Sequence, residues 1–99
     1  MRQDMAHLAL ARRLDAAAAG RLGAELLALR GRPVLIDAGG VELASGLALE
    51  VLVAAARQWR LDGHALEIGH GSPAFQAACE TLALEGELPW ADRSEGAAS

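Results

Sequence analysis

The chain has 99 residues, of which 53% are hydrophobic, enough for one domain with one modest core. Its formal net charge is −4, with 13 acidic against 9 basic residues, and this balance does not favour nucleic acid or an anionic membrane surface as a partner. The single cysteine, Cys79, excludes an intramolecular disulfide and a Cys-rich zinc site. The N-terminus lacks the apolar core of a signal peptide, and no window reaches the roughly 18 uncharged apolar residues of a membrane span. We therefore expect a cytoplasmic protein that does not insert into a membrane.

The first predicted elements are a strand and a helix. Residues from His7 to Ala11 alternate in hydrophobicity, which is typical of a strand at a sheet edge. Asp15 is the predicted N-cap of a helix that runs from Ala16 to about Arg30, with leucines at helical spacing on one face. Gly31 is expected to end this helix.

The most informative stretch runs from Pro33 to Trp59. It opens with the apolar run Val34-Leu35-Ile36, which ends on Asp37 and predicts a buried strand. A short Gly-containing loop follows, and a segment without internal Gly or Pro then predicts a helix from Gly46 to about Leu61. Ser45 is the expected N-cap of this helix. A strand, a tight loop and a helix together place free N–H groups at a helix start, where partners dock.

The apolar arc of this second helix is wider than one sheet contact requires. On a helical wheel the core-facing residues are Ala48, Leu52, Ala55, Ala56 and Trp59. Four further apolar residues flank them, namely Leu47, Leu49, Val51 and Val53. Packing against neighbouring loops is the simpler interpretation, and an apolar docking patch for a partner is the alternative.

The remaining elements are a third strand and a third helix. The strand is predicted from His64 to Ile68, and Ser72 caps a helix from Pro73 to about Leu82. Residues 91–99 are small and polar and are expected to be disordered, which leaves a single domain over residues 1–90. Alternating strands and helices predict an α/β fold, with a small mixed or parallel sheet packed against three to four helices.

No catalytic or metal-binding constellation is apparent. Cys79 lies in the apolar stripe of the third helix, as expected for a buried thiol rather than a nucleophile. His64 and His70 flank the third strand without further ligands at metal spacing. Asp37, at a strand end, is expected to accept hydrogen bonds from loop N–H groups. We expect neither an enzyme nor a bound cofactor or metal.

Three segments, in this order and spacing, resemble STAS domains, and the resemblance covers roughly Leu8 to Leu88. The segments are Arg13-Leu14-Asp15-Ala16-Ala17, Val34-Leu35-Ile36-Asp37-Ala38-Gly39-Gly40-Val41 and Ser72-Pro73-Ala74-Phe75. STAS domains are the fold of bacterial anti-sigma-factor antagonists and also occur in sulfate-transporter tails and lipid-transport complexes. The resemblance implies a protein–protein binding module.

The sequence departs from the family pattern at the start of the second helix. Phosphorylatable members carry a Ser or Thr there, within a D-[ST]-[ST]-G-L pattern, and accept phosphate from a partner serine kinase. Ungapped alignment from Asp37 places Ser45 on the family's Asp and Gly46 on the acceptor. A shift of two residues places Ala44 there instead. The acceptor hydroxyl is therefore missing in both registers, and Ser45 is the nearest alternative.

The resemblance implies two classes of partner. One is a serine-kinase or anti-sigma-type regulator, or a chemotaxis component, in a partner-switching pathway. The other is the ATPase of an ABC-type lipid transporter, of which this chain would be an accessory subunit. In either case the partner-binding residues are predicted at the loop and helix start: Asp37, Gly39, Gly40, Ser45, Gly46, Leu49 and Val53.

Overall fold

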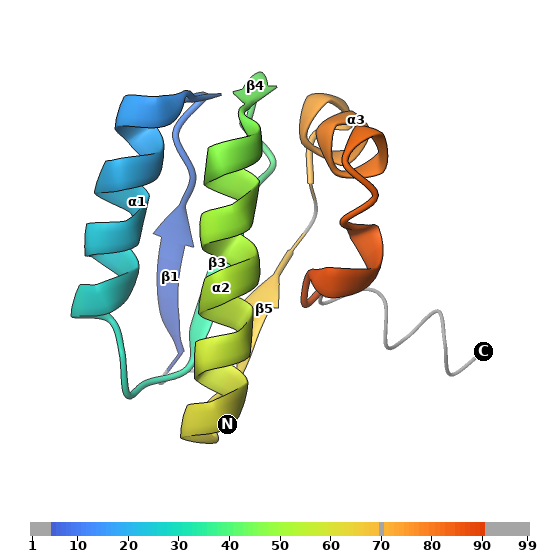
Figure 1. Ribbon diagram of the computed structural model, residues 1–99. Helices are drawn as coiled ribbons and strands as arrows, with labels where there is room; N and C mark the ends of the chain where they lie inside the picture. Colours follow the sequence, from blue (N-terminus) through green and yellow to red (C-terminus); the bar gives the residue numbers. More distant parts are fainter. Residues whose placement is uncertain (1–4, 70, 91–99) are drawn as a thin grey trace.

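The computed structural model describes residues 5–69 and 71–90, which form an α/β fold with a small parallel sheet (Figure 1). Its elements in chain order are β1 (Ala6–Ala9), β2 (Arg13–Leu14), α1 (Ala16–Ala28), β3 (Val34–Asp37), β4 (Leu43–Ala44), α2 (Gly46–Asp62), β5 (Leu66–Ile68), α3 (Pro73–Thr81) and the 3-10 helix η2 (Glu85–Glu87). The predicted fold class is thus confirmed. The predicted tail, residues 91–99, and His70 lie outside the described residues.

The main sheet has the strand order β1-β3-β5, and all its pairs are parallel. β1 lies at an edge, as predicted, although it begins and ends earlier than the expected His7–Ala11. Alternate side chains of the central strand, Val34 and Ile36, are fully buried because they face the helices. Helices α1 and α2 lie side by side over that face of the sheet (Figure 1).

A second, two-stranded sheet pairs β2 with β4 and was not predicted. Each strand has only two residues, too few for any hydrophobic alternation to appear. The pairing is closed on one side by an ion pair between Arg12 and Glu42, with 2.9 Å between nitrogen and oxygen. On the other side, the backbone N–H of Ser45 donates to the carbonyl of Leu14 at 2.8 Å. This small sheet therefore fixes the starts of α1 and α2 beside each other.

Both long helices bury the faces that the helical wheel predicts. In α2 the five residues expected in the core are all buried, namely Ala48, Leu52, Ala55, Ala56 and Trp59. The Trp59 indole N–H also donates to the carbonyl of Arg32 at 2.8 Å, so the C-terminal half of α2 is anchored to the loop before β3. Gly63, with a φ of 79°, ends the helix in the left-handed conformation that glycine favours.

Helix α3 completes the core on the other side of β5. Its N-cap Ser72, its ring Phe75 and its thiol Cys79 are all buried, so the predicted burial of Cys79 is confirmed. The rings of Phe75 and Trp90 meet edge to face, with centroids 5.7 Å apart. The described chain ends against the sheet, because the N–H of Ile68 donates to the carbonyl of Pro89 at 2.8 Å.

Candidate functional site

The start of α2 is the region to which the sequence pointed, and it is built from three separate pieces of chain. Ser45 is the N-cap, as predicted, and its Oγ accepts a hydrogen bond from the N–H of Ala48 at 3.2 Å. Its carbonyl accepts from the N–H of Leu49 at 3.1 Å. The N–H groups of Gly46 and Leu47 have no acceptor among the described residues. This end of the helix therefore presents a half-buried hydroxyl and two free donors.

The loop between β3 and β4 is held by its own polar groups. Asp37 accepts a hydrogen bond from the N–H of Gly39 at 2.9 Å through Oδ1, so its carboxylate stabilises the loop, as expected for an acidic residue at a strand end. Ala38 and Val41 are buried beneath the loop, and the Val41 carbonyl accepts a hydrogen bond from the Ser72 hydroxyl. Gly39 and Gly40 are exposed at its tip. The loop therefore connects the start of α3, through Ser72, with the strand β4 that precedes α2.

Three exposed leucines surround Ser45 and Gly46. Leu43 is two residues before the cap, in β4, and is 43% exposed, and Leu47 is two residues after it and is 53% exposed. Leu82, at the end of α3, is 45% exposed, and its Cδ1 lies 3.5 Å from the position that a Cβ on Gly46 would occupy. We name these three exposed leucines, which adjoin Ser45 and Gly46 in the sequence or by contact, the leucine patch. Sequence reasoning missed Leu82, because only the folded chain brings the end of α3 to Gly46. It also missed Leu43, which adjoins the cap in the sequence but lies in a strand too short to show a pattern.

Two of the predicted partner-binding residues do not lie on this surface. Leu49 is fully buried and Val53 is only 8% exposed, so both belong to the hydrophobic core. The segment that follows α3 covers this side of α2, as the contact of Leu82 with Gly46 and the 3.1 Å ion pair between Arg57 and Glu87 show. In this structure Leu49 and Val53 are therefore packing residues, which agrees with the simpler interpretation of the wide apolar arc.

At the opposite end of α2, hydrogen bonds shift the pKa of Asp62 from its ordinary value. Two hydrogen bonds from Arg30, at 3.0 and 3.3 Å, lower the pKa of the Asp62 carboxyl, and a third from Gln58 at 3.0 Å adds to the effect. The same pair raises the pKa of Arg30. This ion pair joins the C-terminal ends of α1 and α2, about 25 Å along the helix from Ser45 at 1.5 Å per residue.

The described residues contain no cluster of three or more His, Cys, Asp or Glu side chains that could hold a metal ion. Within residues 5–69 and 71–90, no helix is both long enough and apolar enough to cross a membrane. The start of α2 itself offers apolar contact area, one hydroxyl and free backbone donors.

Comparison with known proteins decides the family. The family model described as "Mlab, STAS domain" matches residues 1–89. The chain belongs to the STAS domain family. Neither the curated proteins nor the solved structures yielded a match. STAS domains are generally non-enzymatic modules that mediate protein–protein interaction.

Membership of the STAS family gives the start of α2 a particular meaning. In phosphorylatable STAS domains the acceptor hydroxyl is at this helix start, whereas the first residue of α2 here is Gly46. A Cβ at this position would lie 3.5 Å from the Cδ1 of Leu82, which is van der Waals contact. The hydroxyl closest in sequence is that of Ser45, which is engaged as the helix cap.

Proposed function

We propose that this STAS domain binds a protein partner through the leucine patch, and that it does so without being phosphorylated at the family's acceptor position. The observation that carries the proposal is the exposure of Leu43, Leu47 and Leu82 around the capped start of α2. Large apolar side chains gathered at one exposed place are typical of protein interfaces. Asp37, Gly39 and Gly40 belong to the loop that leads directly into β4 and Leu43.

The apolar character of the leucine patch supports a stable complex rather than a reversible switch. Obligate interfaces are more hydrophobic than transient ones, and the three patch residues are uncharged. Of the two partner classes that the STAS resemblance implies, the ATPase of an ABC-type lipid transporter fits this surface better. In that role the chain would be a non-enzymatic accessory subunit.

A specific feature favours the second candidate, a partner-switching role with a serine-kinase or anti-sigma-type regulator. The Ser45 hydroxyl is at the helix start and is only half buried. A phosphate on it would add charge of about −1.5 to −2 between Leu43 and Leu47, and charge in an apolar interface disrupts docking. This candidate requires phosphate on Ser45 in the cell.

The test is a native pull-down from the source cells with the full chain as bait, followed by mass spectrometry of the captured proteins and of the bait. Leu47→Glu is the decisive variant, because an acidic residue in the first turn of a helix is compatible with its dipole. The matched control is Leu61→Lys: Leu61 is 81% exposed, and a basic residue in the last turn is equally compatible. Thermal melts of both variants verify that they fold.

Three outcomes separate the candidates. Capture of an ABC ATPase by the wild type and by Leu61→Lys, with loss in Leu47→Glu, supports the transporter role. Capture of a regulatory kinase or anti-sigma factor, with phosphate on Ser45, supports the partner-switching role and overturns the first. Equal capture by Leu47→Glu and the wild type shows that the leucine patch is not the docking surface.

A further inference from the structure

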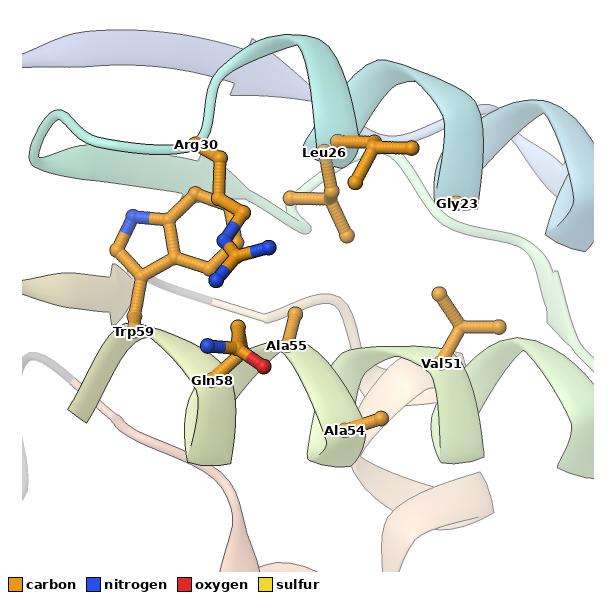
Figure 2. A pocket seen from close by; sticks show the side chains of 9 residues that line it. Gly23, Leu26, Arg30, Val51, Ala54, Ala55, Gln58 and Trp59 are labelled. Carbon is orange, nitrogen blue, oxygen red and sulfur yellow. The ribbon is translucent and has the colours of Figure 1, made fainter. Parts of the chain in front are cut away.

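A second apolar surface lies on the outer side of the helix pair α1–α2, away from the sheet. A groove of about 260 Å³ runs between the two helices, bordered by Gly23 and Leu26 on α1, by Arg30 just after α1, and by Val51, Ala54 and Gln58 on α2 (Figure 2). Leu27, which also lines the groove, is 68% exposed, and Leu61 at the end of α2 is 81% exposed. These are the two most exposed large hydrophobic side chains of the described chain.

Apart from the Arg30–Asp62 ion pair at its C-terminal end, this surface carries no charge between its two flanks. On α1 the exposed residues between its flanks are small or apolar, namely Ala17, Gly20, Ala24, Leu27 and Ala28. On α2 the corresponding residues are Val51, Ala54 and Leu61, of which Val51 is half buried. Small side chains let another helix approach closely, and exposed leucines gain most from being covered. We name this surface the helix face.

Charged residues border the helix face on both sides, and their order along the two helices is opposite. The outer flank of α1 carries exposed Arg21 and then Glu25, about 6 Å further along the helix at 1.5 Å per residue. The outer flank of α2 carries exposed Glu50 and then Arg57, about 10 Å further along. Both helices begin beside the β2–β4 pair and run in the same direction (Figure 1).

We propose that the helix face is a dimer interface that binds a second copy of this chain. Two faces related by a two-fold axis along the helices place α1 of one copy on α2 of the other. Along α1 the basic residue comes first, and along α2 the acidic residue comes first. In this arrangement Arg21 of one copy therefore faces Glu50 of the other, and Glu25 faces Arg57. If the axis instead runs across the helices, each helix meets its own copy in the reverse direction, and bases again face acids.

The face is therefore complementary to itself in either two-fold arrangement, which is the property that a homodimer interface requires. An uncharged centre with a charged rim is also the usual anatomy of a protein interface. Among the described residues, Arg21, Glu25 and Glu50 have no ion-pair partner within the chain. Arg57 contacts Glu87 in an exposed pair, which contributes little to stability and leaves its guanidinium accessible.

The experiment compares two charge-set variants of the full chain by sedimentation velocity over a range of concentrations. The basic set, Glu25→Arg with Glu50→Arg, makes both flanks positive, and the acidic set, Arg21→Glu with Arg57→Glu, makes both negative. Each set alone is expected to raise the dimer dissociation constant roughly 10-fold or more, because every rim contact becomes repulsive. An equimolar mixture of the two sets is expected to form a heterodimer.

Controls keep the dimer separate from the partner proposed above. Leu43→Glu alters the leucine patch alone and is expected to remain dimeric. Ala54→Arg at the centre of the helix face is expected to be monomeric, with the thermal midpoint that the wild type has at concentrations where it is itself monomeric. A wild type that stays monomeric at the highest concentration overturns the proposal. So does a dimer that both charge sets leave intact, because that result places the interface elsewhere. Neither outcome bears on capture of a partner through Leu43 and Leu82, which lie outside α2.

Discussion

Two serines cap neighbouring helices with the same hydrogen bond, but they lie in very different surroundings. Ser72 at the start of α3 is buried; its Oγ accepts from the N–H of Phe75 at 3.0 Å and donates to the carbonyl of Val41. Ser45 at the start of α2 is half buried, and its Oγ accepts from the N–H of Ala48 at 3.2 Å. The hydroxyl of Ser72 is thus fully engaged in holding the fold together, whereas Ser45 lies beside exposed leucines.

The comparison teaches that cap chemistry alone does not reveal function. Both serines satisfy the same sequence rule, because a Ser before a helical segment supplies an acceptor for the first turn. What differs is the environment that the rest of the chain builds around each cap. The loop between β3 and β4 contacts Ser72 and helps to bury it, whereas Leu43 and Leu82 beside the start of α2 are exposed.

The largest effect on the free energy of unfolding is expected from comparing the buried Leu49 with the exposed Leu47, two residues earlier on α2. Leu49→Asp places a carboxylate in the core and should lower the free energy of unfolding by more than about 4 kcal/mol, since it removes a buried leucine and buries a charge. Leu47→Glu, two residues earlier and exposed, should change it by less than about 0.5 kcal/mol. Urea denaturation of both variants measures this contrast. Equal losses would mean that Leu47 is a core residue and that the leucine patch is not free to bind.

The two caps themselves should differ in how much they contribute to stability. Ser72→Ala removes a helix cap and leaves the buried carbonyl of Val41 without its donor, a combined loss of about 2–4 kcal/mol. Ser45→Ala removes only a cap and should cost about 1 kcal/mol, which for a chain of this size lowers the thermal midpoint by roughly 4–8 °C. Ser45→Asp should be close to the wild type, because Asp also caps well.

Calorimetric melts of the three serine variants test this order. Comparable losses for Ser72→Ala and Ser45→Ala would show that the hydrogen bond to Val41 adds nothing. If Ser45→Asp folds normally but loses its partner, the hydroxyl contributes to docking as well as to the cap.

A third contrast concerns the end of α3, which positions Leu82 over Gly46. Ala83 there has a φ of 56°, and the N–H of Leu84 donates to the carbonyl of Cys79 at 2.9 Å, so an alanine occupies the position that glycine normally fills in this type of helix ending. Gly63 holds the equivalent position after α2, where the N–H of His64 donates to the carbonyl of Trp59 at 3.0 Å.

Exchanging these two residue types should therefore have opposite signs. Ala83→Gly should raise the free energy of unfolding by about 1 kcal/mol, because it relieves the left-handed conformation of a residue with a Cβ. Gly63→Ala should lower it by about the same amount, and no heavy atom within 4 Å would obstruct the added methyl group. Thermal melts of the two single variants measure both changes. A destabilised Ala83→Gly variant would instead indicate that the alanine methyl group contributes packing that outweighs the strain.

How far the sequence predicts this molecule depends on how local each feature is. The three main strands, the three helices and the caps Asp15, Ser45 and Ser72 follow from periodicity and cap chemistry within a few residues. The β2–β4 pair joins two dipeptides that are 30 positions apart, and no pattern inside a dipeptide announces its partner. The start of α2 was therefore correctly located, but the structure that fixes it was not.

The composition of the docking surface illustrates the same limit. A helical wheel orders the residues of α2 around its axis, but it does not say how wide the covered arc is. Val53 is covered by the segment after α3, and Leu84 and Glu87 of that segment lie beside it. Leu82 belongs to another element and reaches Gly46 only in the folded chain. The helical wheel therefore does not reveal that the arc of α2 around Val53 is covered.

The smallest expected effect concerns the C-terminal end of α2, where Asp62 forms an ion pair with Arg30. Hydrogen bonds from Arg30 and then from Gln58 hold the pKa of Asp62 below its ordinary value, so the stabilisation from this pair is present above that ordinary value and is lost as the pH falls through the lowered pKa. Arg30→Gln should raise the Asp62 pKa toward its usual range, measured by NMR titration of the carboxyl carbon, and Gln58→Leu should raise it less. At neutral pH both variants should retain the leucine patch and its partner, because the ion pair is at the other end of the helix. An Asp62 titration midpoint that is the same in the wild type and in Arg30→Gln would show that the pair does not persist in solution. The C-terminal end of α2 would then be held by Trp59 and Gly63 without the ion pair.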